Sequence, residues 1–160
     1  MNTFFKSLLV GTVLAFGATS VVSAAGAADP VVGTWELDVA KSRFSPGPAP
    51  KSQTRTYAAT ADGLDMTVTG TNADGSAVSQ KSSFKYDGKD YAISGSADFD
   101  TLSLKTIDDY TVESVQKKAG KTVGRTTRTV SKDGKVLTLT SKGHGASGAT
   151  YDNVMVFDRK

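Results

Sequence analysis

The sequence of 160 residues contains no cysteine, so the chain can form neither a disulfide bond nor a cysteine-ligated metal centre. A cysteine nucleophile and a lipid anchor on a cysteine are excluded for the same reason. Secreted eukaryotic domains of this size often depend on disulfides, so their absence favours a protein of the bacterial periplasm or culture medium. Without cross-links, the domain must be held together by apolar burial and by the hydrogen bonds of its secondary structure.

Histidine and tryptophan are nearly absent, with one residue of each. His144 lies between glycines, where no second imidazole completes a zinc site, and any Ser-His-Asp arrangement would have to use it. The acidic clusters at residues 98–100 and 108–109 lack the spacing of a calcium loop. The glycines of residues 143–148 precede a strand-like segment rather than a helix, unlike those of a phosphate-binding loop. We therefore predict a protein that is not an enzyme and that uses no metal and no other cofactor.

A strong net charge is also missing. The formal net charge is +3, and it falls to +2 without the first 27 residues, which is too weak to predict binding to nucleic acid. Residues 28–100 have 7 basic and 10 acidic side chains, whereas residues 101–160 have 11 basic and 6 acidic. This asymmetry is typical of solvated hairpins. It also leaves a basic surface for an unidentified protein partner, with Lys117, Lys118, Lys121, Lys132 and Lys135 as its candidates.

The first 27 residues have the pattern of a signal peptide. Lys6 supplies a positive charge, a long apolar run follows, and small residues then allow cleavage after Ala27 or, as the second choice, after Ala24. The apolar run is shorter than the roughly 20 residues that span a membrane, and glycines interrupt it, so no stable membrane anchor is expected. We predict a signal peptide over residues 1–27, a single domain over residues 28–160 and a periplasmic or secreted location.

Tight antiparallel hairpins are the main signal in the rest of the chain. Asp-Gly dipeptides, which favour the positive φ of short hairpin turns, separate strand-like runs at Asp62-Gly63, Asp74-Gly75, Asp87-Gly88 and Asp133-Gly134. Helical periodicity is almost absent. We predict ten short strands, over residues 32–38, 52–60, 64–71, 76–86, 89–94, 101–107, 110–117, 122–131, 135–142 and 150–159.

Alternation within these strands predicts one apolar face and one solvated face. Leu64, Met66 and Val68 share one parity, and the residues between them are polar. A long meander of such strands leaves two exposed edges unless it closes on itself. We therefore predict an all-β, antiparallel up-and-down barrel of about 8–10 strands, with a two-sheet sandwich as the alternative. Residues 39–44 are expected to form a helical turn, and the proline-rich residues 45–50 to cross one end of the barrel without regular structure.

Two arginines of one predicted strand, Arg125 and Arg128, face opposite sides because their spacing is odd. Val123 and Val130 have opposite parities, so the pattern does not decide which arginine faces inward. We take Arg125 as the candidate for the interior, where it would pair with a carboxylate or phosphate of a ligand. The alternative is an arginine near the mouth that reaches solvent. The complete set of candidate ligand-binding residues is Tyr57, Met66, Phe84, Leu104, Arg125 and Phe157.

The segment Gly33-Thr34-Trp35 resembles the Gly-x-Trp opening of calycins, the superfamily of lipocalins, fatty-acid-binding proteins and avidins. The resemblance implies that Trp35 closes one end of the barrel and packs against a basic residue of the last strand, for which Arg159 is the candidate. The wider sequence resembles a family of small exported bacterial proteins over the whole chain after the signal peptide, a likeness that implies no particular activity. It includes the segments GTWELDVAKSRFSPGPAPKSQTRTY, YDGKDY, TVSKDGKVLTLTSKG and NVMVFDRK.

The sequence also departs from the better-known calycins. The last strand offers Met155-Val156-Phe157 where fatty-acid-binding proteins have Arg-x-Tyr, and their two-helix lid is replaced by the proline-rich segment. One tryptophan is too few for a biotin site of the avidin type. The resemblance therefore implies an architecture and no specificity for fatty acids, biotin or retinoids.

Two functions follow from these expectations. The first is a lipocalin-like binding protein whose barrel encloses a small apolar or amphipathic ligand. The second is a non-enzymatic envelope interaction or stress protein, for example an inhibitor or accessory factor, whose barrel is filled and which acts through its surface. The two differ in whether the interior of the barrel is hollow.

Overall fold

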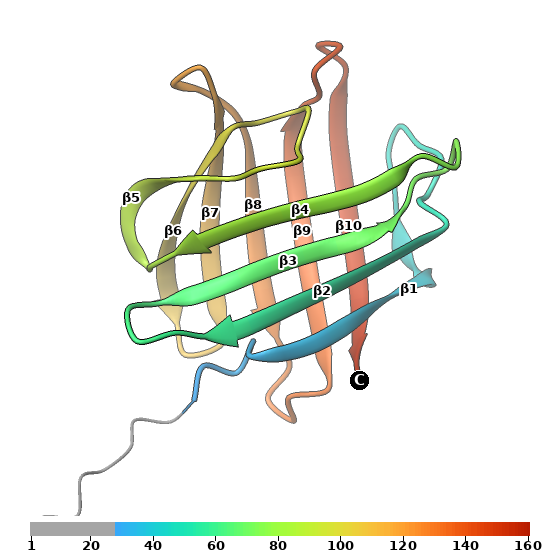
Figure 1. Ribbon diagram of the computed structural model, residues 1–160. Helices are drawn as coiled ribbons and strands as arrows, with labels where there is room; N and C mark the ends of the chain where they lie inside the picture. The colour runs from blue at the N-terminus through green and yellow to red at the C-terminus, as the bar shows by residue number, and fades with distance from the viewer. Residues whose placement is uncertain (1–27) are drawn as a thin grey trace, which may run out of the picture.

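The computed structural model describes residues 28–160, which form ten antiparallel strands in one sheet (Figure 1). Their bounds agree with the predicted ones to within two residues, except at the end of the first strand. The predicted signal peptide and its cleavage site lie in residues 1–27, outside the described residues. The strands are β1 (Gly33–Arg43), β2 (Ser52–Ala59), β3 (Leu64–Thr71), β4 (Ala77–Phe84), β5 (Asp87–Ala92), β6 (Thr101–Asp108), β7 (Thr111–Lys118), β8 (Lys121–Val130), β9 (Val136–His144) and β10 (Thr150–Arg159).

The strands follow one another around a barrel that is almost closed. Their spatial order is β4-β3-β2-β1-β10-β9-β8-β7-β6-β5, so all strands that are consecutive in the sequence pair in the sheet except β4 and β5. The first and last strands, β1 and β10, also pair with each other. Between β4 and β5 only a single bridge, Lys81 with Ser94, joins the two edges, and Ser82 Oγ donates to the carbonyl of Ala92 at 2.8 Å. The predicted up-and-down barrel is confirmed, and the sandwich alternative is wrong.

The expected helical turn at residues 39–44 is wrong, because β1 continues in extended form to Arg43. An irregularity in the pairing of β1 with β10 falls between Asp38 and Arg43. There, Asp38 Oδ1 accepts from the backbone N–H of Lys41 at 3.0 Å, and Ser42 Oγ donates to the carbonyl of Asp38 at 2.6 Å. Side-chain hydrogen bonds therefore satisfy backbone groups of a bulge. Aspartate and serine make similar local hydrogen bonds at the start of a helix, which is why the sequence suggested a helical turn.

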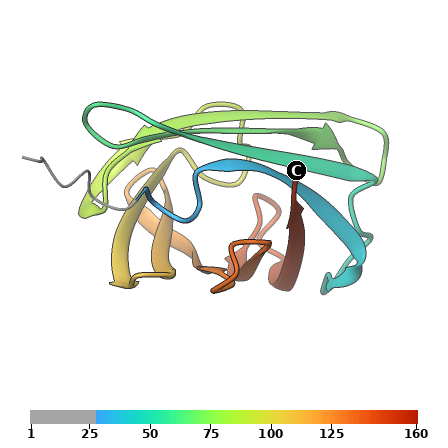
Figure 2. The ribbon, with the colours of Figure 1, turned by 90° about the horizontal axis from the view of Figure 1, so that it is seen from below.

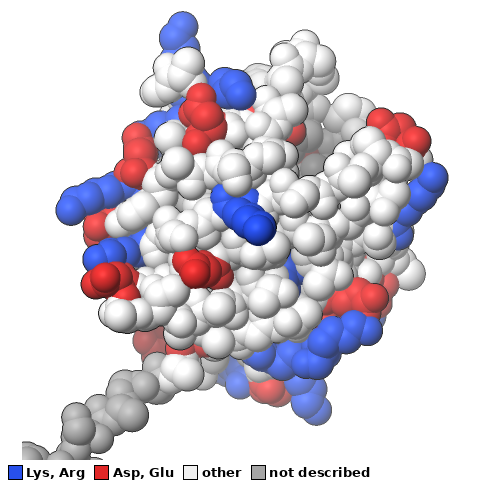
Figure 3. Space-filling model, in the orientation of Figure 1, with Lys and Arg blue, Asp and Glu red and all other residues white. Residues whose placement is uncertain are grey.

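The barrel is flattened into two layers (Figure 2). Strands β2, β3 and β4 form one layer, and β5 to β10 form the other, with β1 turning the corner between them (Figures 1 and 2). On the outside, the β2–β4 layer is largely uncharged, and lysine, arginine, aspartate and glutamate gather at its margins (Figure 3). Within residues 28–160, the structure contains no helix with the length and apolar character of a membrane span.

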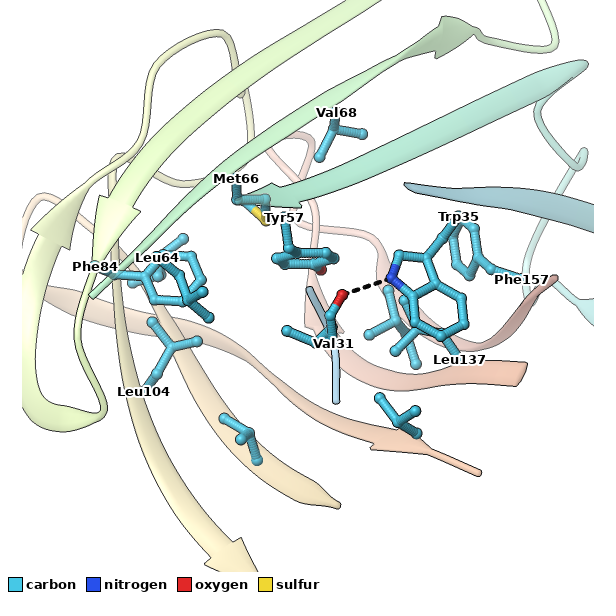
Figure 4. Close-up of a cluster of buried hydrophobic side chains, with 14 of the residues drawn as sticks. Val31, Trp35, Tyr57, Leu64, Met66, Val68, Phe84, Leu104, Leu137 and Phe157 are labelled. Carbon is cyan, nitrogen blue, oxygen red and sulfur yellow. Dashed lines mark hydrogen bonds between the residues drawn. The ribbon is translucent and has the colours of Figure 1, made fainter. Parts of the chain in front are cut away.

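One end of the barrel is closed by the segment that precedes β1. Val31 is fully buried, and its carbonyl accepts from the indole Nε1 of Trp35 at 2.7 Å (Figure 4). Asp29 Oδ1 accepts from the backbone N–H of Val31 at 2.9 Å, and its other oxygen accepts from the Tyr86 hydroxyl at 2.6 Å. The segment thus lies across the opening between the layers and is fixed at both of its ends.

Arg159 holds this closed end together. Its guanidinium carbon lies 4.1 Å from the centroid of the Trp35 ring, so the predicted contact between these two residues is present. The guanidinium also donates to the carbonyls of Pro30 at 2.6 Å and Val32 at 2.8 Å, and to that of Gly134 in the β8–β9 turn. One side chain of the last strand therefore ties the preceding segment, the first strand and a turn to one another.

Candidate functional site

The barrel interior is hollow above its closed end. A cavity of about 310 Å³ lies between the two layers, within the 300–1,000 Å³ that small-molecule sites occupy. Buried apolar side chains form its deep part, and polar side chains, some of them buried, form the part towards the opposite end of the barrel. The lining consists of Gln53, Arg55, Tyr57, Met66, Gln80, Phe84, Ile93, Asp98, Phe99, Leu102, Leu104, Val112, Ser114, Gln116, Thr126, Arg128, Leu139, Ser141, Tyr151, Asn153 and Met155.

Inward side chains of the β7–β10 layer form successive rows across the strands. Because every second residue faces inward, the rows are about 6.6 Å apart along the strands. The row nearest the closed end is apolar, the next contains Arg128, the third is made of polar side chains, and the fourth contains two glycines. From the closed end outward, the rows are Phe157-Leu137-Val130, Met155-Leu139-Arg128-Val112, Asn153-Ser141-Thr126-Ser114 and Tyr151-Gly143-Gly124-Gln116.

Arg128 is a buried cation on the cavity wall. The residue is 7% exposed, and its guanidinium carbon lies 5.2 Å from the ring centroid of Tyr57 and 5.4 Å from that of Tyr86. It donates to the Tyr86 hydroxyl, which in turn donates to Asp29. Burial alone would lower the pKa of Arg128, but the oxygens of Tyr57, Tyr86 and Asp29 outweigh it and raise the pKa, so the side chain stays charged.

The Tyr86 hydroxyl separates this cation from its nearest carboxylate. Burial raises the pKa of Tyr86, the hydrogen bond to Asp29 adds to the rise, and Arg128 opposes it. The phenol is therefore neutral and can donate to Asp29 while accepting from Arg128. No direct ion pair joins Arg128 to a carboxylate within residues 28–160, so its charge is balanced only through the tyrosine.

A second cation, Arg55 of β2, approaches the cavity from the opposite layer. Its Nε donates to Gln53 Oε1 at 3.1 Å, and its Nη1 lies 3.9 Å from Met66 Sδ. The guanidinium carbon is 5.5 Å from the ring centroid of Phe157. In the described part of the chain, Arg55 also makes no ion pair with a carboxylate, so two arginines on facing walls are available to an anion.

The far end of the cavity is bordered by two loops. Asp98, in the loop between β5 and β6, accepts at Oδ1 from the backbone N–H of Ala146 in the β9–β10 loop at 2.8 Å. Phe99 and Tyr151 are partly buried beside it and line the cavity. Burial, and then the charge of Asp98, raise the pKa of Tyr151, which keeps its hydroxyl neutral. The mouth thus offers oxygen acceptors, whereas the deep end offers cationic donors.

Of the six candidate ligand-binding residues named from the sequence, four line the cavity, one lies in the core and one lies on the outer face. Tyr57, Met66, Phe84 and Leu104 line the cavity. Phe157 is fully buried in the core of the closed end, with Arg55 over its ring, and does not line the cavity.

The expected inward position of Arg125 is wrong, because its side chain is 60% exposed on the outer face and pairs with Glu113 at 3.6 Å. The inward arginine is Arg128. A β-bulge explains the error: Gln116 pairs with Gly124 and Lys117 with Thr122, so Val123 is an extra residue that reverses the parity before it. Counting back from Val130 places Arg128 and Thr126 inside, whereas counting forward from Val123 places Arg125 inside, so the two valines gave opposite answers until the bulge was known.

Other lining residues were not identified from the sequence. Ser114, Gln116, Thr126 and Ser141 are polar residues on inward positions, which alternation alone assigns to the solvent face. Tyr151 and Asn153 lie on the parity of Phe157 and could have been found by extending that pattern along β10.

Among residues 28–160, no group of three or more histidine, aspartate or glutamate side chains is placed to hold a metal ion. His144 is exposed and lies beside a shallow groove on the outer face of β7–β9, away from the cavity lining. The polar chemistry of the cavity therefore rests on two arginines, on hydroxyls and amides, and on the Asp98 carboxylate at the mouth.

Neither the family models nor the curated proteins include a match to this sequence. Among solved structures, the chain is similar to the zebrafish ileal bile acid-binding protein complexed with cholic acid, with a TM-score of 0.48 and 15% identity over 82% of this chain and 99% of that one. It is also similar to a redesigned β-barrel, mFAP1, bound to DFHBI, with a TM-score of 0.39 and 13% identity over 81% of this chain and 95% of that one. The assignment of the fold rests on the strand order and pairing of the chain itself.

Proposed function

We propose that this domain is an exported binding protein for a small amphipathic molecule with an anionic head group. The observation that supports it is the pair of arginines, Arg55 and Arg128, which face one cavity of about 310 Å³ without a carboxylate partner in the described chain. The proposal of export comes from the signal-peptide pattern of residues 1–27.

The arginines favour an anion over a neutral ligand. A buried guanidinium loses its hydration, and its cost is offset only when its donors meet acceptors. One nitrogen of the Arg128 guanidinium donates to the Tyr86 hydroxyl, and its other nitrogens donate to no acceptor among residues 28–160. A carboxylate, phosphate or sulfonate matches the fork of donors that remains, and such charge-assisted bonds are the strong ones.

The apolar wall and the volume favour a short hydrocarbon portion. Phe84, Leu104 and Leu139 are all at most 5% exposed and line the cavity, and Leu139 pairs with Arg128. About 310 Å³ lies at the lower end of the volumes of small-molecule cavities. A ligand of that size is a medium-chain acid or a molecule of one or two rings rather than a long lipid. A hollow interior also favours ligand binding over the alternative of a filled barrel that acts through its surface.

Competition titrations test the anionic preference. Purified protein is saturated with 1-anilinonaphthalene-8-sulfonate, and decanoate, decanol and decyltrimethylammonium are compared as competitors. We expect decanoate to displace the probe at the lowest concentration. Equal displacement by decanol and decanoate would contradict the proposal without the use of any variant.

A pair of variants on one strand locates the anion. Arg128→Met removes the inward cation of β8, and Arg125→Met makes the same substitution on the outer face. Loss of one or two charge-assisted hydrogen bonds should weaken decanoate binding about tenfold to hundredfold in Arg128→Met, and by less than twofold in Arg125→Met. Equal affinities in both variants, with unchanged circular dichroism, would show that Arg128 does not bind the head group.

Export is tested separately. The full precursor is expressed in a bacterial host, and the periplasmic fraction is analysed by intact-mass spectrometry. The expected mass is that of a chain that begins at Ala28, or at Ala25 for the second cleavage site. Recovery of only the uncleaved chain from the cytoplasm would contradict it.

A further inference from the structure

Gln116 has a buried polar atom without a hydrogen-bond partner. Its nitrogen Nε2 donates to Ser114 Oγ at 2.9 Å and to Thr126 Oγ1 at 3.0 Å, which uses both amide hydrogens. Its oxygen Oε1 accepts from no group of residues 28–160, and it is the one buried side-chain polar atom there with that property. The residue is 6% exposed and lines the cavity. Unpaired buried acceptors are costly and rare, so this one calls for a donor from elsewhere.

The amide cannot turn away without losing its present bonds. Thr126 Oγ1, which accepts from Gln116, also lies 2.7 Å from Ser141 Oγ. The hydroxyls of three strands are therefore already engaged with one another and with the amide nitrogen. This network fixes the side chain and leaves Oε1 as its open position.

Tyr151 reaches the same place from β10. Gln116, Gly124, Gly143 and Tyr151 occupy one row across four strands, and the two glycines leave room for the tyrosine side chain. A methyl group on Gly124 would collide with the Tyr151 hydroxyl and lie 3.1 Å from Gln116 Oε1. The amide oxygen and the neutral phenol therefore both lie close to Gly124, at the outer part of the cavity.

We propose that Gln116 Oε1 and the Tyr151 hydroxyl form a second polar subsite, which binds a hydroxyl group of the ligand. A hydroxyl can donate to Oε1 and accept from the phenol at the same time. The inference rests on the proposed function and adds a chemical class to it: the ligand is an amphipathic anion that is hydroxylated at the end far from its head group.

The strand register gives an approximate length for a probe of such a ligand. Gly124, the pairing partner of Gln116, and Arg128 are four residues apart on β8, which is about 13 Å at the rise of a strand. An extended chain advances roughly 1.2 Å per bond. A chain of about ten bonds covers this backbone spacing, so 10-hydroxydecanoate is the probe of matching length.

Isothermal titration calorimetry of the purified protein with decanoate and with 10-hydroxydecanoate tests the subsite. One additional hydrogen bond to a buried acceptor should make the hydroxylated acid bind about fivefold to tenfold more tightly. Equal or weaker binding of 10-hydroxydecanoate, with decanoate binding intact, would overturn the subsite and leave the proposed function standing. It would mean that a water molecule satisfies Oε1. Failure of both acids to bind would remove the proposed function and this inference with it.

Variants assign the preference to the named atoms. Gln116→Met keeps the length of the side chain and removes the acceptor, so the affinity ratio of the two acids should fall to about one. Tyr151→Phe should reduce the ratio in part. Lys118→Met, an exposed position on the same strand, serves as the control and should keep the wild-type ratio. A Gln116→Met protein that retains the full preference would contradict the assignment.

Discussion

Replacing Arg159 with lysine tests how the closed end of the barrel is held. The guanidinium stacks on Trp35 and donates to the backbone carbonyls of Pro30, Val32 and Gly134. Lysine keeps the positive charge, but its compact ammonium cannot reach three carbonyls that lie around a planar fork. The substitution therefore removes geometry and leaves charge unchanged.

The expected loss follows from these contacts. A lysine ammonium at this position can replace at most one of the three hydrogen bonds, so two carbonyls lose their charged donor. For a half-buried site we assign about 1 kcal/mol to each lost bond, near the net value of an intramolecular hydrogen bond. Weaker stacking on the indole adds a few tenths of a kcal/mol. We predict that Arg159→Lys lowers the free energy of unfolding by about 2–3 kcal/mol, a large part of the 5–15 kcal/mol of an ordinary domain.

Urea titration followed by tryptophan fluorescence measures this loss at the site itself, because Trp35 is the one tryptophan of the chain. The matched control is Arg43→Lys on β1, whose guanidinium pairs with Asp152 and whose side chain is 59% exposed. That surface pair should contribute less than about 1 kcal/mol. If the two variants unfold at the same urea concentration, Arg159 does not hold the closed end in the way that its contacts indicate.

Three further predictions concern the glycine row, the buried tyrosine and the turns. Gly143→Ala should lower the free energy of unfolding, measured by urea titration, by about 1–3 kcal/mol, because the added methyl would press on the Val123 carbonyl and lie 2.6 Å from Gly124 Cα. The control Gly145→Ala, whose methyl would lie 3.4 Å from the nearest atom, should change this free energy little. Tyr86→Phe should cost about 1–3 kcal/mol, since it leaves Arg128 and Asp29 without their shared partner, and an unchanged melting temperature would contradict this. The pKa values of Asp74 and Asp133 are lowered, first by the hydroxyls of Ser76 and Ser131, and that of Asp108 first by the backbone N–H of Tyr110. A carboxyl whose pKa is lowered in the folded state stabilises the fold above its ordinary pKa of about 4, and this contribution is lost as the pH falls through the folded-state pKa. The melting temperature should therefore be constant from pH 7 to about 5 and fall below about pH 4. The fall should be less steep in Asp133→Asn, which lacks one of these carboxyls.

The sequence predicts the architecture well because two local signals agree. Asp-Gly turns mark where strands end, and alternation marks which face is buried, so the order of hairpins follows without any long-range information. Closure follows from the cost of exposed edges, and the structure joins β1 to β10 as a barrel requires. The one misread segment, residues 39–44, is a bulge whose aspartate and serine hydrogen-bond the backbone as residues at a helix start do.

The position of the inward arginine could not be read from parity alone, because one extra residue in β8 changes the parity within the strand. Sequence gives no direct signal for this bulge, which becomes visible only in the pairing of β7 with β8. Val123 and Val130 then cease to conflict, since they lie on opposite sides of the irregularity. An interior arginine is the residue for which such an error matters most, because its place decides whether the cavity is cationic.

The polar subsite was hidden for a different reason. Alternation assigns polar residues to solvent, so Gln116, Thr126 and Ser141 are read as outward even where their parity is inward. A hollow barrel reverses this rule, since the lining of a cavity can be polar if its groups bond to one another or to a ligand.

The two glycines that share a row with Gln116 are a second signal that alternation does not interpret. A glycine within a strand weakens pairing and marks a place where another group approaches closely, and Gly124 and Gly143 face each other in register beneath the Tyr151 hydroxyl. Inward polar residues that share a row with paired glycines therefore indicate a binding cavity more directly than the apolar residues do. A filled apolar core contains neither unpaired polar side chains nor strand glycines that leave space unfilled.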